Sequence, residues 1–136
     1  MNTSVVIYSG DLRTENVHLA SGSSIITDAP KDNFGKGEYF SPTDLLATSL
    51  ANCILTTMAI ATRKREIDLK GSKATVTKTM GVEPRRVVKI DVAIELPESV
   101  IQFKDELEHA AHNCPVAKSL HPDIQQNVRF SYVLLK

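Results

Sequence analysis

The chain has 136 residues, of which 42% are hydrophobic and 24% charged, and this ordinary globular composition excludes a disordered or low-complexity protein. Sixteen basic residues balance sixteen acidic ones, so the net charge of zero favours neither nucleic acid nor an anionic membrane as a partner. The length predicts one domain over residues 1–136. The first residues lack the basic start and long apolar run of a signal peptide, so we expect a cytoplasmic protein.

The N-terminal part of the chain predicts β-structure followed by a loop. Residues 3–27 contain short β-branched runs separated by the turn signals "SGD" and "ASGS", which predict two or three antiparallel strands. Residues 29–40 contain two Gly, a Pro and four charges without periodicity, as is typical of a loop. Glu38 in this loop is expected to be a solvated charge.

A long helix is predicted over residues 41–65. Ser41 can cap its start, Pro42 suits the first helical position, and Asp44 completes a capping box. Apolar residues lie on more than one face, so we expect burial nearly all round, with a second subunit as the cover. Residues 45–62 carry no charge, but five polar residues interrupt them, so we do not expect a membrane span.

The second half of the chain predicts a mixture of strands and helices. A hairpin is expected over residues 71–96, a helix over 97–114, a short helix that Cys114 caps, and a last strand over 127–136. Strand runs separated by unlike helices indicate the α+β class rather than repeated βαβ units.

The two cysteines are Cys53 and Cys114, and no Cys-x-x-Cys motif is present. Cys53 lies in the middle of the long helix, where apolar burial would raise its pKa, so reactivity would need a cation from elsewhere. A small packing residue is the alternative. Cys114 at a helix N-terminus is expected to have a lowered pKa and to be accessible. The sequence leaves open whether the two thiols meet.

The histidines near Cys114 do not predict a metal site. His109, His112, Cys114 and His121 match no zinc spacing well, because Pro115 breaks the geometry before a fourth ligand arrives. A Cys114–His112 pair for acyl transfer would lack both an orienting group and an oxyanion hole. We therefore expect neither a metal nor a cofactor.

Two segments carry a resemblance to a known family. "GKGEYFSPTDLLATSLANC" and "HNCPVAKSL" resemble the two cysteine segments of the OsmC/Ohr family of small thiol peroxidases. The resemblance implies an α+β OsmC-like fold, with antiparallel sheets wrapped around long central helices in an intertwined homodimer.

The resemblance also implies a reaction. Cys53 would be the peroxidatic cysteine that attacks an organic hydroperoxide, and Cys114 would resolve it to a disulfide that an external dithiol, such as a lipoyl group, reduces. Arg13 would hold Cys53 as thiolate. Thr43 stands where the best-characterised relatives carry Glu, and Asp44 is the carboxylate that could substitute for it.

Two other interpretations stay open. Because of Thr43, the chain could be an OsmC-like protein that binds an apolar small molecule or senses redox state with little peroxidase turnover. In the third interpretation, both cysteines only pack.

Overall fold

The computed structural model describes residues 1–135 as two compact units, which divide between Leu46 and Ala47. Each unit contains its own three-stranded sheet. The assignment of residues 1–136 to one domain stays a prediction. Position 136, which the predicted last strand included, lies outside the described residues.

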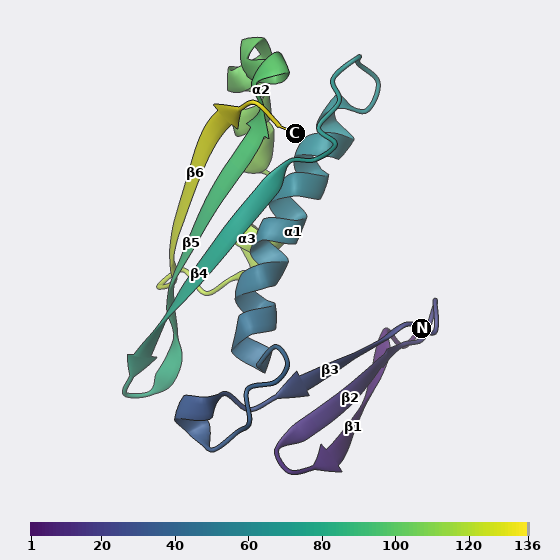
Figure 1. Ribbon diagram of the computed structural model, residues 1–136, viewed down its shortest axis with the longest axis vertical. Helices are drawn as coiled ribbons and strands as arrows, with labels where there is room; N and C mark the ends of the chain where they lie inside the picture. Colours follow the sequence, from purple (N-terminus) through teal and green to yellow (C-terminus); the bar gives the residue numbers. More distant parts are fainter. Residues whose placement is uncertain (136) are drawn as a thin grey trace. The chain divides into compact units, whose positions relative to one another are not determined.

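The first unit is built on the antiparallel sheet β1-β2-β3 (Figure 1). Its strands are β1 (Ser4–Gly10), β2 (Arg13–His18) and β3 (Ser24–Asp28), which confirms the strands predicted over residues 3–27. The short 3-10 helix η1 (Lys31–Asn33) follows in the predicted loop. β1 and β2 therefore place Arg13 at the start of the middle strand.

The loop after β3 folds back on the end of that strand. The Gly35 N–H donates to Pro30 O at 2.9 Å, and the Asp28 N–H donates to Phe40 O at 3.1 Å. A side chain at Gly35 would overlap the Ala29 carbonyl, so this close approach of two backbones requires glycine. The loop is irregular in conformation but closed by its own hydrogen bonds.

Helix α1 (Pro42–Thr62) is 21 residues long and ends three residues before the predicted boundary. The predicted capping box is confirmed. The Asp44 N–H donates to Ser41 Oγ, and the Ser41 N–H donates to Asp44 Oδ2, both at 3.0 Å. Within residues 1–135, α1 is the one helix whose length and composition would allow a membrane span, a property that core helices share.

The second unit contains the mixed sheet β4-β5-β6. Its strands are β4 (Lys73–Val82), β5 (Arg85–Pro97) and β6 (Gln125–Val133). β4 and β5 form the predicted antiparallel hairpin, but β6 pairs with β5 in parallel, so the expectation of purely antiparallel sheets is wrong for this pair. The parallel pairing is possible because the connection between β5 and β6 is long. Parallel neighbours need a crossover of about a dozen residues or more.

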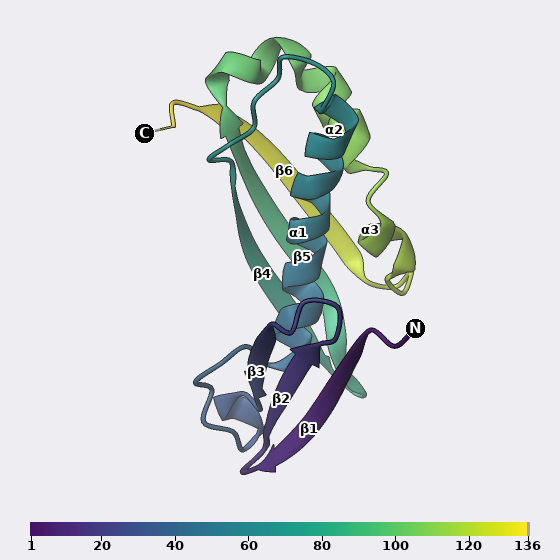
Figure 2. The ribbon, with the colours of Figure 1, turned by 90° about the vertical axis from the view of Figure 1, so that its right-hand side faces the viewer.

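Three short helices form this crossover. They are η2 (Glu98–Phe103), α2 (Lys104–Ala111) and α3 (Pro115–Ser119), so the helix predicted over 97–114 begins as a 3-10 helix. Cys114 is the N-cap of α3 and Pro115 its first residue, as predicted. Both ribbon views place α3 beside the middle of α1 (Figures 1 and 2).

The core of the second unit lies between α1 and β5. Each large apolar side chain buried there contributes roughly 1.5–3 kcal/mol. The fully buried members include Leu50, Ile54, Met58, Ile90, Val92, Ile94, Leu96 and Leu107. The opposite face of α1, which contains Asn52 and Ile60, is exposed. A single chain thus covers one face of α1, and cover by a second subunit stays a prediction.

Candidate functional site

The two cysteines meet inside the second unit. Cys53 comes from the middle of α1 and Cys114 from the N-cap of α3, and a hydrogen bond between the two side chains contributes to the pKa shift of each. Both are free thiols. Cys53 is partly exposed, whereas Cys114 is completely buried. The pair therefore consists of one partly exposed cysteine and one buried cysteine.

Hydrogen-bond donors converge on the Cys53 sulfur. Burial raises the pKa of Cys53, but donation from the Cys114 thiol, the Val116 backbone N–H and the Thr57 side chain outweighs it and lowers the pKa below its usual value. The Thr57 hydroxyl lies 3.7 Å from the sulfur. Cys53 is thus the thiol of the pair that ionises first.

Cys114 is shifted in the opposite direction. Burial is the largest cause of its raised pKa, and the hydrogen bond and negative charge of Cys53 raise it further. Its sulfur still accepts the Ala117 N–H at 3.5 Å, as an N-cap does. The prediction of an accessible Cys114 with a lowered pKa is therefore wrong, because complete burial outweighs the helix N-terminus.

The prediction for Cys53 is also incomplete. Its own helix gives it no free N–H, but α3 does. Pro115 has no N–H, the Val116 N–H lowers the pKa of both thiols, and the Ala117 N–H donates to the Cys114 sulfur. A cysteine in the middle of one helix thus receives hydrogen bonds from the first turn of another. Sequence spacing gave no signal of this contact.

Arg13 is the centre of an ion-pair cluster in the first unit. Its Nε and Nη2 each donate to the Asp28 carboxylate at 2.8 Å, and Nη2 also reaches Glu38 Oε1 at 2.7 Å. The guanidinium stacks on Tyr39, 4.8 Å from the ring centre. The hydrogen bonds from Arg13 are the main reason that the pKa of Asp28 is lowered, although its burial acts in the opposite direction.

Sequence reasoning missed Asp28 and misjudged Glu38. Arg13 and Asp28 lie directly opposite each other on β2 and β3, so the cross-strand register was the available signal. Glu38 is not only a solvated charge. The closed loop brings its carboxylate to Arg13, and its N–H donates to Asp28 Oδ2 at 3.0 Å.

Asp44 caps α1 through its bonds with Ser41, while the Thr43 hydroxyl lies 3.2 Å from Ser41 Oγ. Arg13 and Asp44 belong to the first unit and the two cysteines to the second. A role of Arg13 or Asp44 at Cys53 stays a prediction.

The histidines do not form a metal centre in the part of the chain that the structure describes. No three His, Cys, Asp or Glu side chains gather there in a way that could hold a metal ion. His121 instead accepts the Asp123 N–H at Nδ1, at 3.0 Å.

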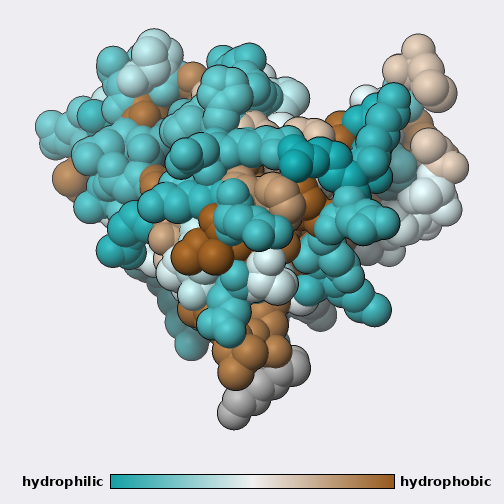
Figure 3. Space-filling view, turned by 90° about the horizontal axis from the view of Figure 1, so that it is seen from above, coloured by the Kyte–Doolittle hydropathy of each residue, from teal (hydrophilic) through white to brown (hydrophobic). Residues whose placement is uncertain are grey.

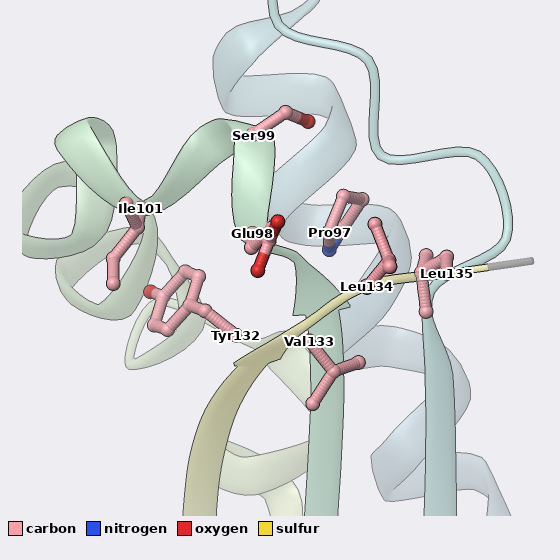
Figure 4. Close-up of a pocket in the computed structure, with 8 residues that line it drawn as sticks. All are labelled: Pro97, Glu98, Ser99, Ile101, Tyr132, Val133, Leu134 and Leu135. Carbon is pink, nitrogen blue, oxygen red and sulfur yellow. The ribbon is translucent and has the colours of Figure 1, made fainter.

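A pocket of about 500 Å³ lies away from the cysteines, at the ends of β5 and β6 (Figure 4). Its walls are mostly apolar, with Glu98 and Ser99 as polar members. The Tyr132 hydroxyl donates to Glu108 Oε2 at 3.0 Å. In the view of Figure 3, hydrophilic residues (teal) cover much of the surface, and hydrophobic residues (brown) are exposed between them. The residues that line this pocket include neither Cys53 nor Cys114.

Comparison with known proteins gives close and distant relatives. An OsmC-like fold is shared by a Psychrobacter arcticus 273-4 protein, provisionally described as an osmotic stress induced and detoxification response protein (53% identity, 96% of each chain covered, TM-score 0.92). An organic hydroperoxide resistance protein OsmC from Legionella pneumophila is 18% identical (96% and 98% covered, TM-score 0.68). An organic hydroperoxide resistance protein from Elizabethkingia anophelis is 15% identical (98% of each chain covered, TM-score 0.74).

No curated protein sequence matches the chain. The profile of the OsmC-like protein family matches residues 35–129, a range that contains both cysteines but not Arg13. With this match over more than half of its length, the chain belongs to the OsmC-like protein family.

Proposed function

We propose that the protein reduces organic hydroperoxides with Cys53 as the peroxidatic and Cys114 as the resolving cysteine. The observation that carries this proposal is the contact between two thiols whose pKa values are shifted in opposite directions. Named hydroperoxide resistance proteins among the structural relatives support the substrate class.

The first step is an attack of the Cys53 thiolate on the terminal oxygen of the hydroperoxide. An S–O bond forms and the O–O bond breaks, so that the sulfur is oxidised to sulfenic acid. The alkoxide takes up a proton and leaves as the alcohol. The lowered pKa of Cys53 raises the thiolate fraction that can start this step.

In the second step the Cys114 sulfur attacks Cys53. An S–S bond forms and water leaves, after which an external dithiol reduces the disulfide by exchange. Two of the causes that raise the pKa of Cys114 come from Cys53 itself, its hydrogen bond and its charge. Oxidation of Cys53 removes that charge, so Cys114 ionises more easily when it is needed.

The same proposal includes a homodimer. The four apolar residues Val5–Tyr8 of β1 are all exposed, as is Ile60, which lies two helical turns beyond Cys53 on the same face of α1. Exposed apolar surface of this kind is typical of protein interfaces. Sedimentation velocity should give the mass of two chains. Ile60→Glu should weaken the dimer, while Val82→Glu at the exposed end of β4 should not. A single-chain mass for the wild type would reject the dimer.

Peroxide consumption tests the proposed reaction. With dithiothreitol as the reductant, the wild type should consume cumene hydroperoxide continuously. Cys53→Ser should abolish consumption. In the absence of dithiothreitol, Cys114→Ser should consume about one equivalent of peroxide and stop at the Cys53 sulfenic acid without forming the Cys53–Cys114 disulfide. Wild-type consumption no faster than that of Cys53→Ser would overturn the proposal.

One observation favours the second candidate, a binding or redox-sensing protein with little turnover. Two carboxylates already neutralise Arg13. In addition, the family resemblance implies a Glu at the position that Thr43 occupies in this chain. Native mass spectrometry of the purified protein separates the two functions. A bound small molecule, together with no Cys53–Cys114 disulfide after peroxide treatment, would support the second one.

A further inference from the structure

Three threonines of α1 use their hydroxyl groups in different ways. Thr56 Oγ1 donates to the Asn52 carbonyl at 3.0 Å, and Thr62 Oγ1 donates to the Met58 carbonyl at 3.0 Å. Both are the usual bond to the carbonyl four residues back. The Thr57 side chain instead contacts the Cys53 sulfur at 3.7 Å, its only hydrogen-bond partner within residues 1–135.

Helix geometry explains why Thr57 can reach the sulfur. Residues i and i+4 lie on the same face of a helix, so the Thr57 and Cys53 side chains are neighbours one turn apart. The β-branched side chain has few rotamers, which keeps the hydroxyl in position. The Cys53 carbonyl is already approached by Thr56 Oγ1 at 3.2 Å. The Thr57 hydroxyl contacts the sulfur of the same residue.

We propose that Thr57 is a catalytic residue, whose hydroxyl donates a hydrogen bond to the Cys53 sulfur and stabilises it as the attacking thiolate. Ionisation fixes the direction of this bond, because a thiolate has no proton and can only accept. A hydrogen bond to a charged partner is stronger than one to a neutral partner, so Thr57 stabilises the thiolate more than the thiol. The hydroxyl keeps its proton throughout.

This role rests on the proposed function, in which Cys53 is the nucleophile. The other groups that act on the sulfur are the Cys114 thiol and the Val116 N–H, both from the start of α3. Thr57 is the donor that α1 itself supplies, so it stays beside the sulfur even if Cys114 moves to form the disulfide.

The test is the pH dependence of Cys53 alkylation by iodoacetamide in a Cys114→Ser background, which requires no peroxide. Thr57→Val keeps the shape of the side chain and removes the hydroxyl. We expect its alkylation rate at pH 7 to fall roughly three- to tenfold and its titration midpoint to rise. Thr57→Ser should restore the wild-type profile, and Thr56→Val, which removes the neighbouring hydroxyl, should leave it unchanged.

Thermal melting checks that each variant is folded, and Thr57→Ala gives a second way to remove the hydroxyl. Coincident profiles for Thr57→Val and Thr57→Ser would overturn the inference, as would an equal shift in Thr56→Val. Alkylation and peroxide reduction are measured separately. If the wild type reduces no peroxide but the variants show the expected order of alkylation rates, the proposed function is rejected, while the hydrogen bond from Thr57 to the Cys53 thiolate is supported.

Discussion

Arg13 and Asp28 form a two-pronged ion pair between β2 and β3, with both hydrogen bonds at 2.8 Å and the carboxylate almost completely buried. Arg13 is opposite Asp28 in the strand register, and Glu38 adds a second carboxylate from the loop. The pair thus links the middle strand to the loop that precedes α1.

The first prediction concerns the acid side of the stability profile. The folded pKa of Asp28 is lowered, chiefly by Arg13, so its contribution to stability is present above the unfolded pKa of about 3.9 and is lost as the pH falls through the folded pKa. Urea unfolding from about pH 7 to about pH 3 should show this loss.

Asp28→Asn should lower the free energy of unfolding at neutral pH and flatten its fall with decreasing pH. Glu66→Gln, at an exposed position, should change neither. An unchanged slope in Asp28→Asn would contradict this account.

The second prediction concerns the order in which the thiols react. Cys53 is partly exposed with a lowered pKa, and Cys114 is buried with a raised pKa. Limited iodoacetamide treatment near neutral pH, followed by peptide mass spectrometry, should therefore find the label on Cys53 first. Faster labelling of Cys114 would mean that the assignment of the ionised thiol is reversed.

The third prediction concerns the core under α1. Leu96 on β5 is fully buried, so Leu96→Ala should lower the free energy of unfolding by about 2–5 kcal/mol through lost contacts and a cavity. Val82, at the exposed end of β4, is the control, and Val82→Ala should stay within about 0.5 kcal/mol. Chemical denaturation of both variants measures the difference. Similar losses would show that burial of Leu96 is not the cause.

The fourth prediction concerns the loop that positions Glu38. Gly35→Ala places a methyl group on the Ala29 carbonyl, so the loop must open and the Glu38–Arg13 contact should be lost. Hydrogen exchange over residues 29–40 should accelerate. Gly22→Ala meets open space and only a positive φ, so it should have a smaller effect that leaves this loop protected. Unchanged exchange in Gly35→Ala would contradict the predicted opening.

Much of the fold could be predicted because its signals are local. The capping box of Ser41 and Asp44, the helix N-cap at Cys114 and the alternating pattern of β5 each depend on residues a few positions apart. The parallel pairing of β6 with β5 could not be predicted in this way, because it depends on how a long crossover returns the chain to the sheet.

The sequence by itself determined the elements, the family resemblance and the two cysteines as candidate reactive groups. Only the tertiary structure decided which thiol ionises first, because the shifts of the two pKa values depend on burial and on donors from distant positions, such as Val116 for Cys53. The partners of Arg13 were decided in the same way, by strand register and loop closure. Electrostatic environment is a property of neighbours in space, and spacing along the chain does not encode it directly.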